Sequence, residues 1–392
     1  MKRNTLKVLV VALLWSMGFS FSWLFIGVYI YQISSNLPLS TLFYSIPQTA
    51  WIIGSIIWGV LSDVKFRRKM ILGVSSILFG LFLVPFIFIR NPLLLIIFFT
   101  TAYFFASGKN ASLNAYITII EKKRGKALSW VIMAASTGWF IGSLSSGFIY
   151  ENLSPTILFV FSSAFIIVAG LISFTLKEGK KVITKDNVSH FQVYLTLLKK
   201  PIIGVTCIVG FILYVAQNLV SSVFSVYFVN GLGGTPTLYS IASAGAAGLG
   251  IFASFTLGHL SEKKWFGRAG AIFYSIIGYI IFYLMILTKD LFIVAIGWAL
   301  PFYAGIMIGG PAFVSDHSEK DKRSRGMALF DMFSSVGSTL GYIFASLVIF
   351  FLMLSDIIQT MILLTILGIF ATLLAFVIFV IGLKIILNKK QQ

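Results

Sequence analysis

Residues 59–69 read GVLSDVKFRRK, and residues 258–268 read GHLSEKKWFGR. The two stretches begin 199 positions apart, and both carry a glycine, a leucine, a serine and an acidic residue at matching places. Each is rich in Lys and Arg and follows a long apolar run. A motif that recurs at so wide a separation indicates two copies of one larger unit.

Two further pairs of stretches recur in the same order. Residues 121–128 read EKKRGKAL, and residues 321–329 read DKRSRGMAL, so that Gly125 matches Gly326. The pattern Gly-x-x-x-Gly stands at Gly138 and Gly142, and again at Gly337 and Gly341. Three pairs at nearly one offset predict a duplicated structural unit of about half the chain.

The composition is that of a membrane protein: 58% of the 392 residues are hydrophobic and 11% are charged. A soluble chain carries about 25% charged residues, so a soluble enzyme and a disordered protein are excluded. A membrane-spanning helix needs about 20 apolar residues. Twelve stretches qualify as expected spans: 8–31, 41–61, 70–89, 93–118, 127–150, 155–176, 201–229, 237–260, 269–288, 291–315, 326–350 and 357–383.

The 30 basic residues are distributed in alternation among the connections. The amino terminus, the carboxyl tail and the connections after the second, fourth, sixth, eighth and tenth spans hold 27 of them. The connections after the odd-numbered spans hold 2, and the remaining one, Lys109, lies within a span. Lys and Arg concentrate on the cytoplasmic side of membrane proteins. We therefore expect a multi-pass protein of the cell membrane with both termini in the cytoplasm. The net charge of +18 reflects this topology and not a nucleic-acid partner.

The longest connection, 177–200, divides the chain into six spans and six spans. We expect an amino-terminal bundle over 1–176, a central cytoplasmic loop over 177–200 and a carboxyl-terminal bundle over 201–392. Within the loop, His190–Leu198 is amphipathic and is expected to form a short helix at the membrane surface. The first apolar stretch is longer than the core of a signal peptide and is expected to be a retained helix.

The pattern Gly-x-Leu-x-Asp-x-x-x-Arg-Arg at 59–68 resembles the signature of the major facilitator superfamily, and the resemblance extends over essentially the whole chain. It implies an all-α fold with twelve transmembrane helices in two six-helix bundles. It further implies a secondary transporter that works by alternating access, without a cofactor and as a monomer. The partners would be a small-molecule substrate, the lipid bilayer and a coupling proton or ion.

The loop motifs also carry a physical expectation about gating. Asp63 and Glu262 end even-numbered helices on the side where odd-numbered helices begin, so they can face positive helix ends. Each such contact is worth about 1 kcal/mol, which is small enough to form and break in every cycle. The alternative is that these charges only anchor the topology. The expected gating residues are Gly59, Asp63, Arg67, Arg68, Glu121, Gly258, Glu262, Arg268 and Asp331.

Lys109 is the one basic residue deep inside an apolar span, and Asn110 and Asn114 follow it on the same helix. Charges within a membrane usually face a water-filled cavity on the substrate or ion path. We therefore expect these three residues to bind substrate. The alternative is a lysine that reaches the lipid headgroups, with the two asparagines joining neighbouring helices.

The seventh span carries a polar stripe at helical spacing, which includes Tyr214, Gln217 and Asn218. In the superfamily, helices 1, 4, 7 and 10 line the central cavity, and the resemblance places this stripe there. Hydrogen bonding between helices is the alternative. The first span adds Trp15 and Trp23. The tenth adds Trp298 and Tyr303, with a bend expected at Gly309-Gly310-Pro311.

The sequence contains no phosphate-binding loop, nucleophile elbow or zinc-protease motif, so an enzyme is not expected. A single cysteine, Cys207, excludes a multi-cysteine metal site. We expect a transporter of a small organic solute, anionic or amphipathic, working as an exporter or an importer. A sensor or receptor that has lost transport, or a channel, are the alternatives.

Overall fold

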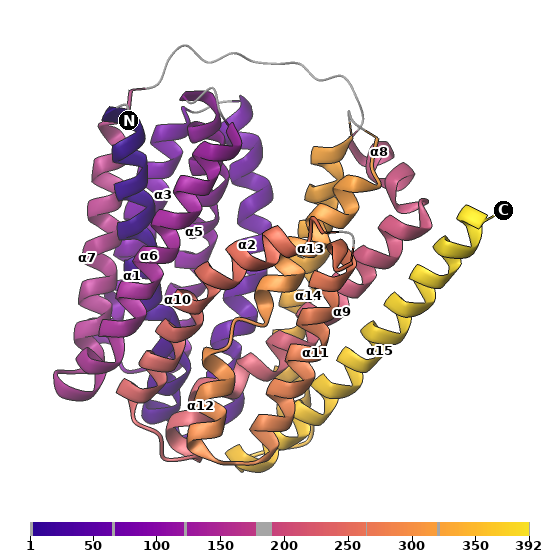
Figure 1. Ribbon diagram of the computed structural model, residues 1–392. Helices are drawn as coiled ribbons and strands as arrows, with labels where there is room; N and C mark the ends of the chain where they lie inside the picture. The colour runs from indigo at the N-terminus through magenta and orange to yellow at the C-terminus, as the bar shows by residue number, and fades with distance from the viewer. Residues whose placement is uncertain are drawn as a thin grey trace. The chain divides into compact units, whose positions relative to one another are not determined.

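The computed structural model describes residues 3–64, 67–120, 124–177, 190–263, 265–319 and 322–391. These residues form helices and turns without a strand (Figure 1). The first half contains α1 (Arg3–Ser34), α2 (Leu37–Val64), α3 (Arg68–Leu83), α4 (Pro85–Phe88), α5 (Pro92–Ile120), α6 (Arg124–Asn152) and α7 (Pro155–Phe174). The remainder contains α8 (His190–Leu198), α9 (Pro201–Val226), the π-helix η1 (Tyr227–Gly231), α10 (Pro236–Leu260), α11 (Gly267–Leu287), α12 (Leu291–Ala299), α13 (Tyr303–Asp316), α14 (Arg323–Phe351) and α15 (Ile357–Gln391).

These helices match the expected spans. In the described part of the chain, 11 helical stretches are long and apolar enough to cross a membrane. The second expected span lies in α2, a helix of 28 residues. The third consists of α3 and α4 in succession, and the tenth of α12 and α13. The short helix predicted at His190–Leu198 is confirmed with the same bounds.

The chain folds into two compact units. Unit 1 contains Met1–Lys185 together with Ser225–Gly248, and unit 2 contains Asp186–Phe224 together with Leu249–Gln392. Unit 1 thus includes the end of α9 and the first half of α10 in addition to the first seven helices. The expected division of the sequence into 1–176, 177–200 and 201–392 stays a prediction.

The repeated glycine pairs serve one purpose in both units. In unit 1, a Cβ added at Gly138 would lie 2.1 Å from the carbonyl oxygen of Leu13, so α6 and α1 pack backbone to backbone. In unit 2, a Cβ at Gly337 would lie 2.4 Å from the carbonyl oxygen of Phe211, so α14 packs on α9 in the same way. Small residues permit this close approach between membrane helices. The sequence repeat is therefore also a repeat of helix packing.

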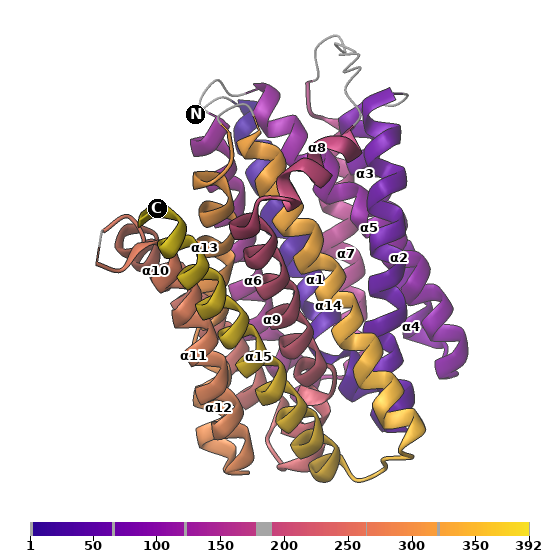
Figure 2. The same ribbon diagram turned by 90° about the vertical axis from the view of Figure 1, so that its right-hand side faces the viewer.

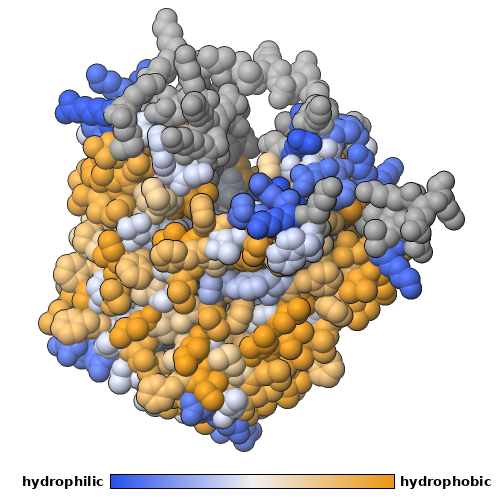
Figure 3. Space-filling model, viewed as in Figure 1, coloured by the Kyte–Doolittle hydropathy of each residue, from blue (hydrophilic) through white to orange (hydrophobic). Residues whose placement is uncertain are grey.

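The outer faces of the helices are apolar. Large exposed hydrophobic side chains include Phe252, Phe255 and Phe370. On the face shown in Figure 3, hydrophobic side chains cover most of the surface of the long helices. In water such a surface would aggregate, and in a bilayer it faces lipid. In unit 2, α15 lies alongside α9 and α11 (Figure 2).

The end of α7 collects polar contacts from the other helices of unit 1. Lys7 donates to the carbonyl and hydroxyl oxygens of Thr175 at 3.2 and 2.8 Å, and Lys69 donates to the carbonyl of Leu176 at 3.1 Å. The Tyr116 hydroxyl donates to the carbonyl of Lys177 at 2.7 Å. Cations at a carboxyl-terminal helix end satisfy free carbonyl groups and oppose the helix dipole. The basic ends of α1 and α3 therefore lie at one end of unit 1.

The tenth span has an interruption that the sequence did not predict. Gly309-Gly310-Pro311, where a bend is expected, lie inside the helix α13, and the bend stays a prediction. The interruption lies at residues 300–302, around Pro301, between α12 and α13. A proline lacks the N–H group of a helix and forces the preceding residue to an extended conformation. Leu300 has this conformation, with φ −78° and ψ 130°.

Candidate functional site

Lys109 lies inside unit 1 on α5, eleven residues before the end of the helix at Ile120. That distance is ~16 Å along the helix axis. The residue is 6% exposed, and its ammonium nitrogen lies 4.1 Å from the centroid of the Trp15 ring on α1. A cation over the face of an indole ring is attracted by the negative charge of that face. The structure therefore brings together two residues that the sequence had placed on separate spans.

Trp15 belongs to a larger group of rings, which we call the unit 1 aromatic cluster. The Phe19 ring stacks on Trp15 at 5.0 Å and on Trp23 at 5.9 Å, so one face of α1 is aromatic at every fourth residue. The other helices add rings within about the same distance. The cluster consists of Trp15, Phe19, Trp23, Tyr44, Trp51, Phe79, Tyr103 and Trp139.

Trp15 and Trp23 were expected from the sequence, and the other members of the cluster, among them Phe19, Tyr103 and Trp139, were not. Phe19 could have been found from the spacing of four residues between Trp15, Phe19 and Trp23, which puts them on one helix face. Tyr103 lies on α5 and Trp139 on α6. They contact Phe19 only because these helices pack on α1, so spacing within one helix does not predict them. The cluster offers an apolar, polarisable surface next to a buried cation.

The two asparagines expected on α5 are described in part, and two serines of the same helix are described in full. Asn110 and Asn114 lie in the helix, but their side chains fall outside the described residues. Ser107 donates to the carbonyl of Phe104 at 2.8 Å and lies against Gly54 of α2, so it supports packing. Ser112 is fully buried, and its hydroxyl has no hydrogen-bond partner among the described residues.

The polar stripe of the seventh span divides into different environments. Asn218 is buried and donates to the carbonyl of Tyr214 at 2.8 Å and to the Ser338 hydroxyl of α14 at 3.1 Å. That amide therefore joins two helices of unit 2. Ser225 contributes to unit 1, where its hydroxyl lies 3.2 Å from the hydroxyl of Tyr44. Tyr214 and Gln217 are half-buried.

Trp298 and Tyr303 stand on opposite sides of the interruption in the tenth span. Trp298 lies at the end of α12 and stacks on Phe224 of α9, with ring centroids 4.0 Å apart and planes at 14°. Tyr303 is the first residue of α13, and its hydroxyl lies against Gly250 of α10. Both residues belong to unit 2, and both are half-buried.

Some of the first-copy gating residues fall outside the described part of the chain. Gly59 and Asp63 lie in α2, but the surroundings of their side-chain positions are not described, and Glu121 lies outside the described residues altogether. Arg67 is exposed just before α3, and Arg68 is half-buried at its start. The contacts expected between these charges in the first copy stay a prediction.

The second copy of the motif is well described. Arg268, at the start of α11, donates from Nε to Asp316 at 3.2 Å and from Nη1 to the Ser261 hydroxyl at 2.6 Å. The serine of the motif is therefore a partner of its arginine. Glu262 is exposed in the turn after α10. A Cβ added at Gly258 would meet no described atom within 4 Å, so the expected close approach is not made there.

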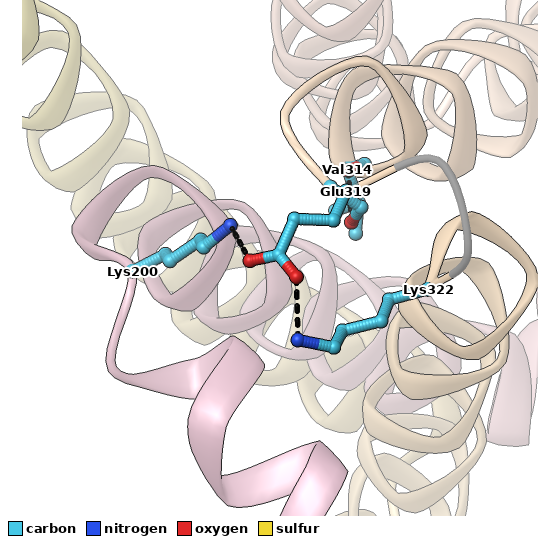
Figure 4. A network of polar contacts seen from close by, with 5 residues as sticks. Lys200, Val314, Glu319 and Lys322 are labelled. Atoms are coloured by element: carbon cyan, nitrogen blue, oxygen red, sulfur yellow. Dashed lines mark hydrogen bonds and ion pairs between the residues drawn. The ribbon is translucent and has the colours of Figure 1, made fainter.

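Two further charged groups complete this end of unit 2. Glu319 accepts from Lys200 at 3.0 Å and from Lys322, and so joins the residue before α9 to the connection between α13 and α14 (Figure 4). These two lysines lower the pKa of Glu319 to about 2. Glu319 is not among the residues expected from the sequence. Asp331 is exposed on α14, eight residues after its start at Arg323.

Membrane-spanning helices, a packing motif repeated in two units and ion pairs at the helix ends define a class: a polytopic helical membrane protein. The chain belongs to the Major Facilitator Superfamily, whose family model matches residues 8–296 and 206–384. Family and fold support a secondary transporter and not an enzyme.

Individual relatives agree with this assignment. Multidrug resistance protein 1 of Bacillus subtilis (strain 168) is 25% identical over 288 residues, which cover 71% of this chain and 72% of that protein. The nucleoside transporter NupG has a similar fold, with a TM-score of 0.79 at 12% identity, covering 96% of this chain and 99% of that one. A bacterial homologue of the human lysosomal transporter Spinster, in an inward-facing and unoccupied conformation, gives 0.77 at 16% identity, with 98% of each chain covered. These two structures share the fold.

Proposed function

We propose that this protein carries a small organic solute with an anionic group across the cell membrane by alternating access. One observation supports the choice of solute above the others: the ammonium of Lys109 lies over the Trp15 ring, inside an apolar unit. Charges within a membrane usually face the substrate or ion path, and a cation there would attract a carboxylate or sulfonate group of the substrate.

The unit 1 aromatic cluster supplies the rest of the recognition. Its rings offer a flat apolar surface beside the cation, which suits a solute with an aromatic or otherwise hydrophobic portion. Asn110 and Asn114 on the same helix are proposed as hydrogen-bonding groups, and Tyr214, Gln217, Trp298 and Tyr303 as contributions from unit 2. Asn218 contributes less directly, because its amide already bonds to Ser338.

Gating is proposed to depend on the charged ends of the helices. The Arg268 contacts with Asp316 and Ser261 hold the start of α11 to the ends of α13 and α10. Exposed ion pairs of this kind contribute about 1 kcal/mol or less, so they can open in each cycle. We propose that both termini are cytoplasmic, that the monomer is the working unit and that a proton or ion is coupled to transport. The name of the Bacillus relative favours export over uptake.

The proposal is tested by binding to the purified protein. The probes are 1-naphthoate, an aromatic carboxylate, and 1-naphthamide, which has nearly the same shape and no charge. We expect naphthoate to bind more tightly, and Lys109→Gln to weaken it roughly 10- to 100-fold, the range for a charged hydrogen bond. Lys109→Arg should keep part of the affinity, and Lys7→Gln is the control lysine. Equal binding of both probes, or unaltered binding by Lys109→Gln, would contradict the proposal.

A further inference from the structure

Residues from three helices of unit 1 meet at one buried point. The hydroxyl of Tyr44 on α2 lies 3.2 Å from the hydroxyl of Ser225 on α9, and one of the two donates a hydrogen bond to the other. The backbone N–H of Gly27 on α1 donates to the same Tyr44 oxygen at 3.3 Å. Tyr44 is 4% exposed and Ser225 is 1% exposed. The bond between the hydroxyls therefore joins α2 to the end of α9 inside unit 1.

Gly27 makes room for the two hydroxyl groups. A Cβ added there would lie 2.8 Å from the Tyr44 hydroxyl oxygen and 3.0 Å from the Ser225 hydroxyl oxygen. A side chain on α1 would therefore displace one or both of them. In the other copy of the repeat, the residue 200 positions after Tyr44 is Ala244, which has no hydroxyl group. The bond is thus a feature of this pair and is not required by the repeated fold.

A part of the second half of the chain packs in unit 1. Residues 225–248 belong by sequence to the expected carboxyl-terminal bundle, but they form one compact unit with the first seven helices. The Tyr239 ring meets the Phe25 ring edge to face at 5.6 Å, and a Cβ added at Gly147 on α6 would lie 2.3 Å from the carbonyl oxygen of Pro236. Two repeated halves that alternate access move relative to each other. Under the proposed function, this packing therefore opens in each cycle.

Tyr44 also contacts the surface proposed to meet the solute. Its ring meets the Trp23 ring edge to face, with ring centroids 4.9 Å apart and planes at 88°. Trp23 in turn stacks on Phe19 within the unit 1 aromatic cluster. A solute that places an aromatic group against Trp23 competes with Tyr44 for this contact. A shift of the Tyr44 ring carries its hydroxyl away from Ser225.

The backbone changes its winding immediately after Ser225. The π-helix η1 begins at Tyr227, and Tyr227 and Phe228 are fully buried. Single turns of π-helix are rare and are often found at functional sites. The bond from Tyr44 therefore reaches α9 at the point where the regular helix ends.

We propose that Tyr44 is a positioning residue that couples solute binding to the release of residues 225–248 from α1 and α6. While its hydroxyl bonds to Ser225, the end of α9 and the start of α10 are held in unit 1. A solute bound beside Trp23 displaces the Tyr44 ring, the bond to Ser225 breaks, and the segment leaves more readily. The solute part of this inference rests on the proposed function, whereas the holding bond is tested without a solute.

The experiment measures how often the start of α10 leaves α6 in the purified protein. The reporter is Ser240→Cys with Cys207→Ala, because Ser240 is fully buried and its hydroxyl donates to the carbonyl of Leu144 on α6 at 3.3 Å. A maleimide reaches this position when α10 moves away from α6. Tyr44→Phe and Ser225→Ala should each raise the labelling rate about two- to tenfold, the effect of one hydrogen bond on an equilibrium.

The design separates the bond from general packing. Tyr44→Phe and Ser225→Ala combined should label no faster than either alone, because both remove the same bond. Tyr29→Phe is the matched control, since its hydroxyl accepts from Arg90 at 2.7 Å within the first half of the chain, and it should label like the parent protein. The probe 1-naphthoate should speed labelling of the parent protein and should have no effect on Tyr44→Phe. Hydrogen–deuterium exchange of residues 236–248 gives the same comparison without the reporter cysteine.

Unaltered labelling and exchange in Tyr44→Phe would overturn the proposal. So would additive effects of the two substitutions, or an equal effect of Tyr29→Phe, because a general loss of packing gives both. If 1-naphthoate binds to the parent protein and leaves labelling unchanged, Tyr44 does not couple binding to release. If 1-naphthoate does not bind, the proposed function and the coupling fail together, while labelling without solute still decides whether the bond holds the segment.

Discussion

The ammonium of Lys109 lies 4.1 Å from the centre of the Trp15 ring, and both side chains are buried inside unit 1. The contact joins α5 to α1 within unit 1. The attraction between a cation and an indole face favours this position of the ammonium, beside the aromatic cluster.

The first prediction concerns Trp15. Replacing it with leucine removes the ring under the ammonium and one side of the aromatic surface. Since a buried cation–π contact is worth about 1–2 kcal/mol, 1-naphthoate should bind roughly 5- to 30-fold more weakly. Calorimetric titration of the purified variant measures this. Trp265→Leu is the control, because that ring is 74% exposed and lies outside the cluster. Equal effects of the two substitutions would show that Trp15 has no special role.

The second prediction concerns the ion pair of Arg268. Asp316→Asn removes its acidic partner, and the start of α11 should open more readily. A cysteine placed at the exposed Arg323, with Cys207 replaced by alanine, should react with a maleimide up to about five times faster, the limit for an exposed pair. Glu151→Gln removes an exposed acid near the end of α6, which is not among the expected gating residues, and should not change the rate. An unaltered rate in Asp316→Asn would refute the gating contact.

The third prediction concerns pH. Lys200 and Lys322 lower the pKa of Glu319 to about 2, below its ordinary value of 4.5, so the fold favours the ionised carboxylate. The stabilisation from these two ion pairs is therefore complete at pH values above the ordinary pKa of the carboxyl group, and it is lost as the pH falls through about 2. Hydrogen exchange around Glu319 should be slower in the wild type than in Glu319→Gln from neutral pH down to about 4. The difference should disappear near pH 2. A difference in exchange between the two proteins that is already lost at pH 4–5 would contradict the lowered pKa of Glu319.

The fourth prediction concerns helix packing. Gly138→Ala would put a methyl group 2.1 Å from the carbonyl oxygen of Leu13, and the rigid backbones of α6 and α1 would have to separate. Overpacking of this kind costs about 1–3 kcal/mol, so the melting temperature should fall. Gly258→Ala meets no described atom within 4 Å and should leave it unchanged or raise it slightly. The reverse order of the two melting temperatures would disprove the packing role.

The fifth prediction concerns orientation. A reporter fused after Gln392 should be found in the cytoplasm, and one inserted at Gly233, in the turn between η1 and α10, should be found outside. The reason is the distribution of Lys and Arg among the connections. Protease protection or reporter activity measures each position. The opposite location of either reporter would overturn the expected topology.

Features that follow from local spacing were predictable from the sequence, and features that depend on contacts between helices were not. The glycine pair at Gly138 and the short helix at His190–Leu198 were predictable, because both follow from local spacing and from the order of polar and apolar residues. The place of the interruption in the tenth span was not. The span contains both Pro301 and Pro311, and only the structure shows that one helix ends just before Pro301 while the next continues through Pro311.

Contacts between side chains of distant helices could not be predicted from the sequence either. A polar stripe on the seventh span was evident, but the bond from Asn218 to Ser338 depends on how α9 packs on α14. The contact of Lys109 with Trp15 likewise depends on the packing of α5 near α1. The spacing of residues on one helix predicts which face is polar, and tertiary packing decides what that face meets.

The most direct test of the central claim is solute counterflow in proteoliposomes. Vesicles loaded with unlabelled 1-naphthoate are diluted into a trace of the labelled compound. A carrier that exposes Lys109 to each side in turn should accumulate label transiently above equilibrium, and Lys109→Gln should not. No accumulation in the wild type, as for a sensor, or a flux that neither saturates nor exchanges, as for a channel, would contradict the account.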